Sequence, residues 1–112
     1  MAIKVLVVDD SALMRKKISE LLAQAGGFVV KTAKNGVEAI ALNNEFAPDV
    51  VTLDINMPEM DGLTALAELM LQRPVPVVML SSLTAKGALT TLEALALGAV
   101  DYLAKPDDPQ LS

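Results

Sequence analysis

Four consecutive aliphatic residues run directly into two acids in Val5-Leu6-Val7-Val8-Asp9-Asp10, near the start of this 112-residue chain. An unbroken aliphatic run of this length is typical of a parallel strand that is covered on both faces. A second such run, Val50-Val51-Thr52-Leu53, ends in Asp54. Ligands of open α/β sheets bind in the crevice beyond the carboxyl ends of the strands. If the two strands are neighbours, three carboxylates share one crevice.

Acids that lie so close together raise one another's pKa unless a cation joins them. Mg²⁺ is a hard cation that takes carboxylate, carbonyl and water oxygens in an octahedral array. The sequence therefore predicts a magnesium site that includes Asp9, Asp10 and Asp54.

The composition is that of one small domain with an aliphatic core, because the chain is 53% hydrophobic but carries only two Phe and one Tyr as aromatic residues. A net charge of −5 argues against nucleic acid or an anionic membrane as a partner. The chain has no Cys and no His, which excludes thiol chemistry, a Ser-His-Asp triad and the commonest zinc ligand. No apolar stretch reaches transmembrane length. These features predict a soluble cytoplasmic domain.

Apolar runs alternate with helical patterns at a steady interval, which is typical of βαβ units and predicts an α/β doubly wound parallel sheet. Strands are expected over residues 5–8, 28–33, 50–54, 77–80 and 100–104. Helices are expected from a Ser11 cap to Ala25, from the Asn35-Gly36 turn to before Pro48, from about Leu63 and over 86–97. The predicted inward side chains of the first two helices are Met14, Ile18, Leu21, Leu22 and Ala25, then Val37, Ile40 and Ala41.

A fifth helix is expected to be missing or truncated, because residues 107–112 are short and interrupted by Pro109. We therefore expect a domain over residues 1–106, followed by the start of a linker or a truncated tail. This would leave aliphatic side chains uncovered around Val100 and Leu103 and over residues 77–80, with possible self-association through the face of the fourth helix and fifth strand.

Two further polar residues, Ser81 and Lys105, are expected at strand ends on the same edge of the sheet. Alone, each polar strand end is equally well explained as a helix cap or a solvated loop residue. Together they fit a phosphoryl site, since an Asp carboxylate can act as a covalent nucleophile, a Lys and a metal neutralise phosphoryl oxygens, and a Ser hydroxyl donates to one of them. Asp54 is the best candidate for the nucleophile because it stands alone on its strand, which leaves Asp9 and Asp10 for the metal.

These motifs resemble the receiver domain of two-component response regulators over nearly the whole chain. The residues that carry the resemblance are Val8-Asp9-Asp10-Ser11, Leu53-Asp54, Met57-Pro58, Met60-Asp61-Gly62, Ser81 and Lys105-Pro106. The resemblance implies a flavodoxin-like fold with five parallel strands in the order 2-1-3-4-5.

The resemblance also implies a role for each site residue. Asp54 would accept a phosphoryl group from a phosphohistidine of a sensor histidine kinase. Asp10, Asp54 and the carbonyl of Asn56 would bind Mg²⁺, and Asp9 would assist through water. Lys105 would contact the phosphoryl group.

Three further implications concern the response to phosphorylation and the shape of the loop after the last strand. Ser81 would be drawn to the phosphoryl oxygen, and Tyr102 stands at the position of an aromatic switch that turns inward. The bond between Lys105 and Pro106 is expected to be cis.

A narrower similarity is to the receiver of the chemotaxis protein-glutamate methylesterases (the CheB type). It is carried by Thr52-Leu53-Asp54, Arg73-Pro74, Pro76-Val77-Val78-Met79, Ser81-Ser82-Leu83-Thr84 and Gly98-Ala99-Val100-Asp101-Tyr102. In that family the receiver restrains a C-terminal esterase domain until it is phosphorylated. This chain departs from the subgroup at Asn56, where an acid is frequent.

Three alternatives stay open at this point. The chain could be a stand-alone messenger receiver, which the sequence after Ser112 would reveal. It could be a haloacid-dehalogenase-type phosphohydrolase, although that nucleophile belongs on the first strand as Asp-x-Asp, whereas Asp9 and Asp10 are adjacent. It could also be a receiver-like domain that is never phosphorylated.

Overall fold

A computed structural model describes residues 2–55, 57, 60–81 and 93–105. It contains a five-stranded sheet in the order β2-β1-β3-β4-β5, and every neighbouring pair is parallel, as predicted. The strands are β1 (Ile3–Val8), β2 (Phe28–Ala33), β3 (Val50–Asp54), β4 (Val77–Ser81) and β5 (Asp101–Ala104). The helices with described bounds are α1 (Ala12–Ala25), α2 (Gly36–Phe46) and α3 (Gly62–Gln72).

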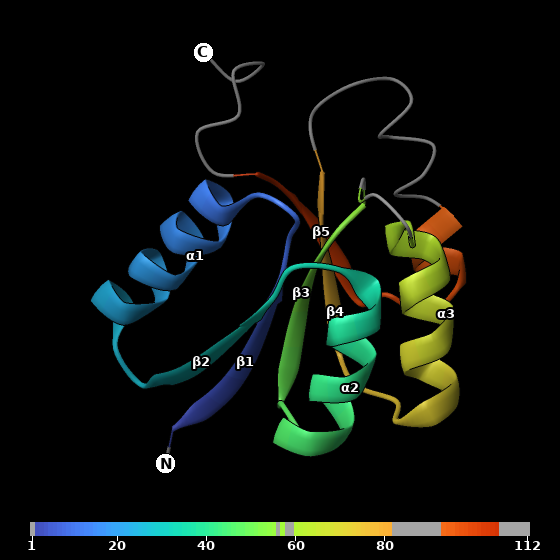
Figure 1. Ribbon diagram of the computed structural model, residues 1–112, viewed down its shortest axis with the longest axis horizontal. Coiled ribbons are helices and arrows are strands. Elements are labelled where there is room, and N and C mark those ends of the chain that lie inside the picture. The colour runs from blue at the N-terminus through green and yellow to red at the C-terminus, as the bar shows by residue number, and fades with distance from the viewer. Residues whose placement is uncertain (1, 56, 58–59, 82–92, 106–112) are drawn as a thin grey trace.

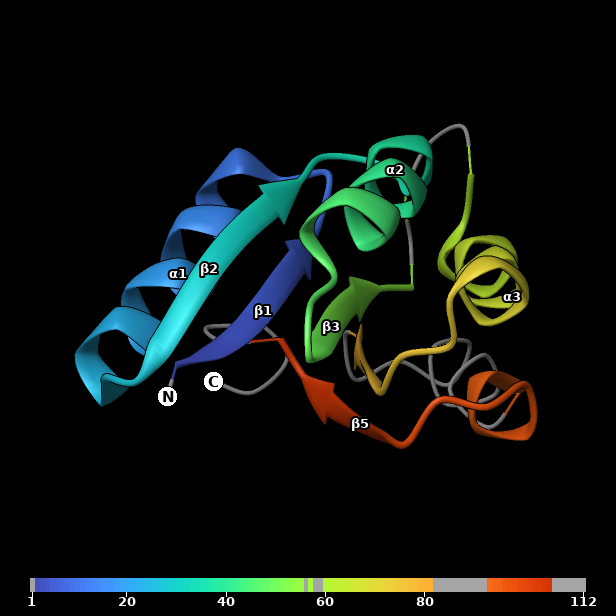
Figure 2. The same cartoon turned by 90° about the horizontal axis from the view of Figure 1, so that it is seen from below.

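Helices cover both faces of this sheet. Figures 1 and 2 show α1 on one face and α2 with α3 on the other. Alternate residues of β1 divide between two cores, since Val5 and Val7 pack with Ile18 of α1, whereas Leu6 and Val8 join the larger core under α2 and α3. The carboxyl ends of all the strands consequently lie along one edge of the sheet.

The element boundaries follow local sequence signals. The Ser11 hydroxyl accepts a hydrogen bond from Met14 N (3.2 Å) and caps α1, which ends at Ala25 before Gly26. β1 begins earlier than predicted, because Ile3 N donates to Gly27 O (2.9 Å) and extends the pairing with β2. β4 likewise continues through Ser81, and β5 starts at residue 101.

The inward faces of two helices differ from the prediction. In α2 the side chain of Val37 is 60% exposed and Ala41 is exposed, while the buried residues are Gly36, Ala39 and Asn43. Small residues turn inward there because α2 packs against α3 as well as the sheet. In α1, Leu21 and Ala25 lie at the surface, whereas Ile18 is buried and Met14 and Leu22 are partly buried against the same core, as predicted.

The sequence predicted uncovered aliphatic side chains near the last strand, and Val100 and Leu103 are indeed 61% and 56% exposed. The same prediction is wrong for Val77, Met79 and Leu80, which are buried in the two cores. Most of the predicted fourth helix, the Lys105–Pro106 bond and residues 107–112 lie outside the described residues. In the part of the chain that the structure describes, no helix is long and apolar enough to cross a membrane.

Candidate metal and phosphoryl site

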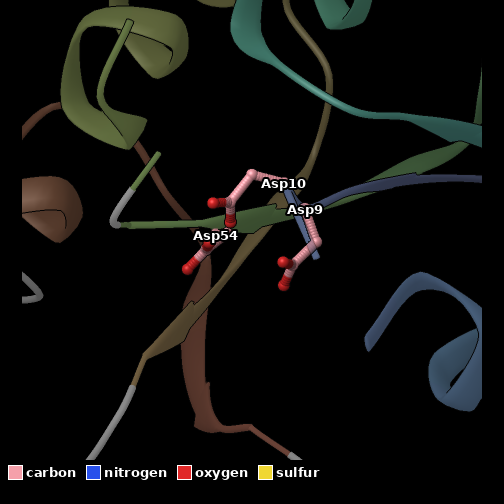
Figure 3. Close-up of side chains that lie close together, drawn as sticks. All are labelled: Asp9, Asp10 and Asp54. Carbon is pink, nitrogen blue, oxygen red and sulfur yellow. The ribbon is translucent and has the colours of Figure 1, made fainter. Parts of the chain in front are cut away.

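Three acids meet at the carboxyl edge of the sheet. Asp54 is the last residue of β3, and Asp9 and Asp10 follow β1, which pairs with β3 in parallel register. One carboxylate oxygen from each acid lies within 4.8 Å of the others. Figure 3 shows the three carboxyl groups gathered at the ends of these two strands. The neighbouring strands therefore bring together the acids that the sequence predicted.

The acids differ in their exposure to solvent. Asp9 and Asp54 have no exposed surface, whereas Asp10 is exposed. Asp9 is fixed by hydrogen bonds that include one from Ser11 N to its Oδ1 (2.9 Å) and one from its own N to Ala33 O (3.1 Å). Asp10 makes no hydrogen bond or ion pair within the described residues. Its position at the site is therefore fixed through the backbone that carries it and not through contacts of its carboxylate.

Lys105, the residue after β5, contributes a cation to the site. Its Nζ lies 2.8 Å from Asp54 Oδ1 and 3.5 Å from Asp9 Oδ2, and its side chain is only 19% exposed. The register of the sheet places it there, because Lys105 N donates to Ser81 O (3.1 Å) at the end of β4. Lys105 thus bridges acids from two different strands.

Burial raises the pKa of Asp9, whereas the neighbouring acids outweigh burial at Lys105. Loss of water raises the pKa of the Asp9 carboxyl above its ordinary value of 3.8, and the Ser11 amide and the Lys105 ammonium offset this only in part. Burial alone would lower the pKa of Lys105, but its hydrogen bond to Asp54 and the charges of Asp54 and Asp9 raise it. Lys105 therefore stays charged while it faces the acids.

The donor set fits a hard divalent cation. When all three acids are ionised, a single ammonium from Lys105 leaves an excess of negative charge in this cluster, two of whose acids are buried. Asp9 Oδ2 is buried and accepts no hydrogen bond from any described residue, and its cationic neighbour, Lys105 Nζ, lies 3.5 Å away, so this oxygen can still approach a further positive ligand. Carboxylate oxygens are the ligands that Mg²⁺ prefers. The predicted carbonyl ligand, Asn56, lies outside the described residues.

Ser81 lies at the carboxyl end of β4, and Tyr102 lies on the neighbouring strand β5, two residues before the level of Ser81. Ser81 lies at the end of β4, as predicted, but it is buried, with only 5% of its surface exposed. It is enclosed because β5 pairs alongside it, at Ala104. Tyr102 lies on β5 beside Met79 and is 48% exposed. The structure thus places its ring at the surface.

Two residues that shape the site were not identified from the sequence. Gly62, the first residue of α3, donates its N–H to Ile55 O (2.8 Å), and a Cβ there would lie 2.4 Å from Asp54 O. Arg15, in the first turn of α1, donates from its Nη1 to Asp9 O (2.7 Å). A glycine after a polar loop and a cation on a helix are both too common to signal such contacts in advance.

Comparison with known proteins identifies the family. The model of the response regulator receiver domain matches residues 5–111. A protein-glutamate methylesterase/protein-glutamine glutaminase 3 from Rhodospirillum rubrum is 64% identical over 104 residues, which are 93% of this chain and 28% of the relative. A relative of the same name from Vibrio cholerae is 61% identical over 103 residues, 92% of this chain and 29% of the relative. The chain thus spans less than a third of the length of these curated relatives.

Solved structures agree. The response regulator domain of Thermotoga maritima CheB superposes with a TM-score of 0.88 at 45% identity, covering 96% of this chain and 81% of that one. The chemotaxis protein CheY4 of Vibrio cholerae gives 0.84 at 35% identity, covering 98% and 92%. Sheet order, matched residues and relatives agree, and the chain belongs to the response regulator receiver domains.

Proposed function

We propose that this chain is a phosphoacceptor switch in which Asp54 takes a phosphoryl group from the phosphohistidine of a sensor histidine kinase. The observation that carries this proposal is the surrounding of Asp54: a carboxylate at a strand end, with no exposed surface, 2.8 Å from Lys105 and beside two further acids. A buried acid that served only to cap a helix would not need a cation and two acids around it.

In the proposed reaction, an Asp54 carboxylate oxygen attacks phosphorus, the nitrogen–phosphorus bond of the donor breaks, and an acyl phosphate forms. The donor histidine leaves as a neutral imidazole after it takes up a proton. The Lys105 ammonium, which now lies 2.8 Å from Asp54 Oδ1, would then contact the negatively charged phosphoryl oxygens. A bound Mg²⁺ would neutralise phosphoryl oxygens, held by Asp10, Asp54 and the carbonyl of Asn56, with Asp9 acting through water.

The proposed response involves Ser81 and Tyr102. Ser81 ends β4 beside Ala104, one residue before Lys105, so its hydroxyl is a candidate donor to the phosphoryl group. Movement of that hydroxyl would vacate space that the Tyr102 ring, now 48% exposed, could fill. This would be a two-state element that a local charge event biases.

The proposed output is a chemotaxis methylesterase domain in the longer protein, because the relatives that match this chain at more than 60% identity carry that name and are more than three times as long. In this proposal residues 1–106 are the receiver, residues 107–112 begin a linker, a chemotaxis kinase is the donor and the cytoplasm is the location. The stand-alone messenger is the alternative, and the sequence that follows residue 112 separates the two.

Transfer of labelled phosphate tests the function. A purified chemotaxis histidine kinase carrying a radioactive phosphoryl group would be mixed with the wild-type chain, with Asp54→Asn and with Asp101→Asn, an exposed acid on β5. We expect label to move to the wild type and Asp101→Asn in Mg²⁺, and not to Asp54→Asn. Equal labelling of Asp54→Asn would refute the assignment of the acceptor.

A further inference from the structure

A cation on α1 reaches into the acidic loop. Arg15 lies in the first turn of the helix, is only partly exposed, and donates from Nη1 to the main-chain oxygen of Asp9 at 2.7 Å. Its neighbour Lys16 points to solvent, with a side chain that is 73% exposed and 4.0 Å from Glu20. Two adjacent cations therefore have different environments, and only Arg15 touches the loop that carries the acids.

The carbonyl that Arg15 holds belongs to the peptide unit between Asp9 and Asp10. On the other side, Asp9 is already fixed through Ala33 and Ser11. Because a peptide unit is planar, holding its oxygen also fixes the direction in which the Asp10 amide and Cα leave it. Asp10 has no hydrogen bond of its own within the described residues, so this peptide plane is what fixes the position of its Cα, from which the carboxylate extends toward Asp54.

The chemistry of the side chain suits this position. A guanidinium is always charged and has five donors in a rigid planar fork, so it can hold one carbonyl and still present positive charge to nearby acids. The adjacent pocket contains Asp9, Asp10 and Asp54, which repel one another before any metal enters. Arg15 thus combines a geometric constraint with compensating charge at one point of the loop.

We propose that Arg15 is a positioning residue for the metal site, which holds the Asp9–Asp10 peptide so that the Asp10 carboxylate faces Asp54. This rests on the proposed function, since it assumes that these acids hold Mg²⁺. Removal of groups that orient metal ligands typically weakens metal affinity by 10–100-fold. We expect loss of the Arg15 side chain to weaken Mg²⁺ binding by about tenfold while the fold remains.

The test compares Arg15→Met with Lys16→Met, which removes the same charge from the next residue of the same helix. The Mg²⁺ dissociation constant of the unphosphorylated chain is measured by NMR titration, and thermal melts establish that each variant folds. Amide hydrogen exchange at Asp9, whose N–H donates to Ala33 O (3.1 Å), is measured without metal. We expect weaker Mg²⁺ binding and faster Asp9 exchange in Arg15→Met, and less than about a twofold change in Lys16→Met because exposed charge is screened.

A kinetic measurement separates positioning from chemistry. Adduct formation from acetyl phosphate in Arg15→Met should need more Mg²⁺ for half-maximal rate, yet reach the wild-type rate at saturation. Arg15→Gln against Lys16→Gln repeats the comparison with polar replacements should Arg15→Met not melt cooperatively. Affinities that match between the Arg15 and Lys16 variants would overturn the positioning role alone. Absence of any Mg²⁺ response in the wild type would overturn the proposed function as well.

Discussion

Asp9 shows how burial and charge compete at a single residue. Its pKa is raised, so the folded chain holds this proton more tightly than the unfolded chain does. The protonated carboxyl is tolerated at low pH, and this contribution to stability is lost as the pH rises through the raised pKa. Ionised Asp9 then faces Asp10 and Asp54, with Lys105 Nζ 3.5 Å from its Oδ2.

Replacing Asp9 by Asn should therefore stabilise the metal-free fold at neutral pH. The Asn oxygen can still accept from Ser11 N, while the buried charge is gone. Thermal melts with a chelator across a pH series would measure the gain, which should disappear as the pH falls below about 3.8, the ordinary value for this acid. Asp101→Asn is the control, since Asp101 is exposed and accepts from Tyr102 N in the same manner. A loss of stability in Asp9→Asn at neutral pH would contradict this account.

Mg²⁺ should stabilise the chain through the same three acids. A ligand that binds only the folded state adds RT ln(1 + [L]/Kd), about 2.7 kcal/mol at a hundredfold excess over Kd. Melts with and without millimolar-scale Mg²⁺ would show a higher melting temperature in the wild type. Asp10→Ala should lose that shift yet fold normally, because Asp10 is exposed. The same shift in Asp10→Ala would place the ion elsewhere.

At this scale the acids could be predicted and the contacts around them could not. A strand end is visible as the point where an aliphatic run meets a polar residue, which is why Asp9, Asp54, Ser81 and Lys105 were expected on one edge. The reach of Arg15 to a carbonyl depends on a rotamer and on the path of the β1–α1 loop. Helical periodicity predicts that such a residue is exposed to solvent, and no other signal in the sequence indicates the contact with the carbonyl.

At the scale of elements, the first residue of α3 lies in close contact with the end of β3, which carries Asp54. A Cβ on Gly62 would lie 2.4 Å from Asp54 O and 2.7 Å from the Cα of Ile55, both backbone atoms. Gly36 holds the equivalent first position of α2, but there a Cβ would meet the flexible end of Met60. The two glycines therefore differ in what must move to admit a methyl group.

Gly62→Ala should destabilise the fold by about 1–3 kcal/mol, the usual cost of overpacking a close contact. Gly36→Ala should destabilise the fold less, because the Met60 side chain can shift away from the new methyl group. Both substitutions gain the same helix propensity, so this gain does not affect the comparison. Urea unfolding of both variants measures the difference. An equal or larger loss in Gly36→Ala would mean that the approach of α3 to Asp54 is not tight.

Sequence patterns predicted the bounds of the elements better than they predicted which side chains of a helix face the core. The bounds of α1, β2 and β3 follow caps, glycines and apolar runs, and they agree with the prediction. On the inward face of α2 the prediction is correct at Ile40, which is partly buried against the larger core. It is wrong at Val37 and Ala41, which are exposed, while contact with α3 buries Gly36, Ala39 and Asn43. A helix that packs against two neighbours has its orientation fixed by tertiary contacts that the sequence pattern does not contain.

At the scale of the whole molecule, the sheet has an apolar groove on its α1 face. It has a volume of about 320 Å³ and is lined by Ile18, Leu21, Leu22, Thr52, Leu80, Leu103 and Ala104. Leu103 and the nearby Val100 are more than half exposed. An apolar surface that is open in the described part of the chain favours association in solution.

We expect weak self-association of the 112-residue chain through this face. Light scattering over a concentration series would show a rising mean mass in the wild type and less of it in Leu103→Ser. Val37→Ser is the matched control, since Val37 is 60% exposed on α2, across the sheet. A monomer at every concentration, or equal effects of the two substitutions, would refute this prediction.

The central claim is that Asp54 is phosphorylated in a site that needs a divalent cation. The most direct measurement incubates the chain with acetyl phosphate and Mg²⁺, records the intact mass, reduces the acyl phosphate with borohydride and maps the modified residue by peptide sequencing. The account predicts one phosphoryl group per chain, reduction at Asp54 alone, and no adduct with a chelator or in Asp54→Asn. An adduct at another residue, or an undiminished adduct without Mg²⁺, would contradict it.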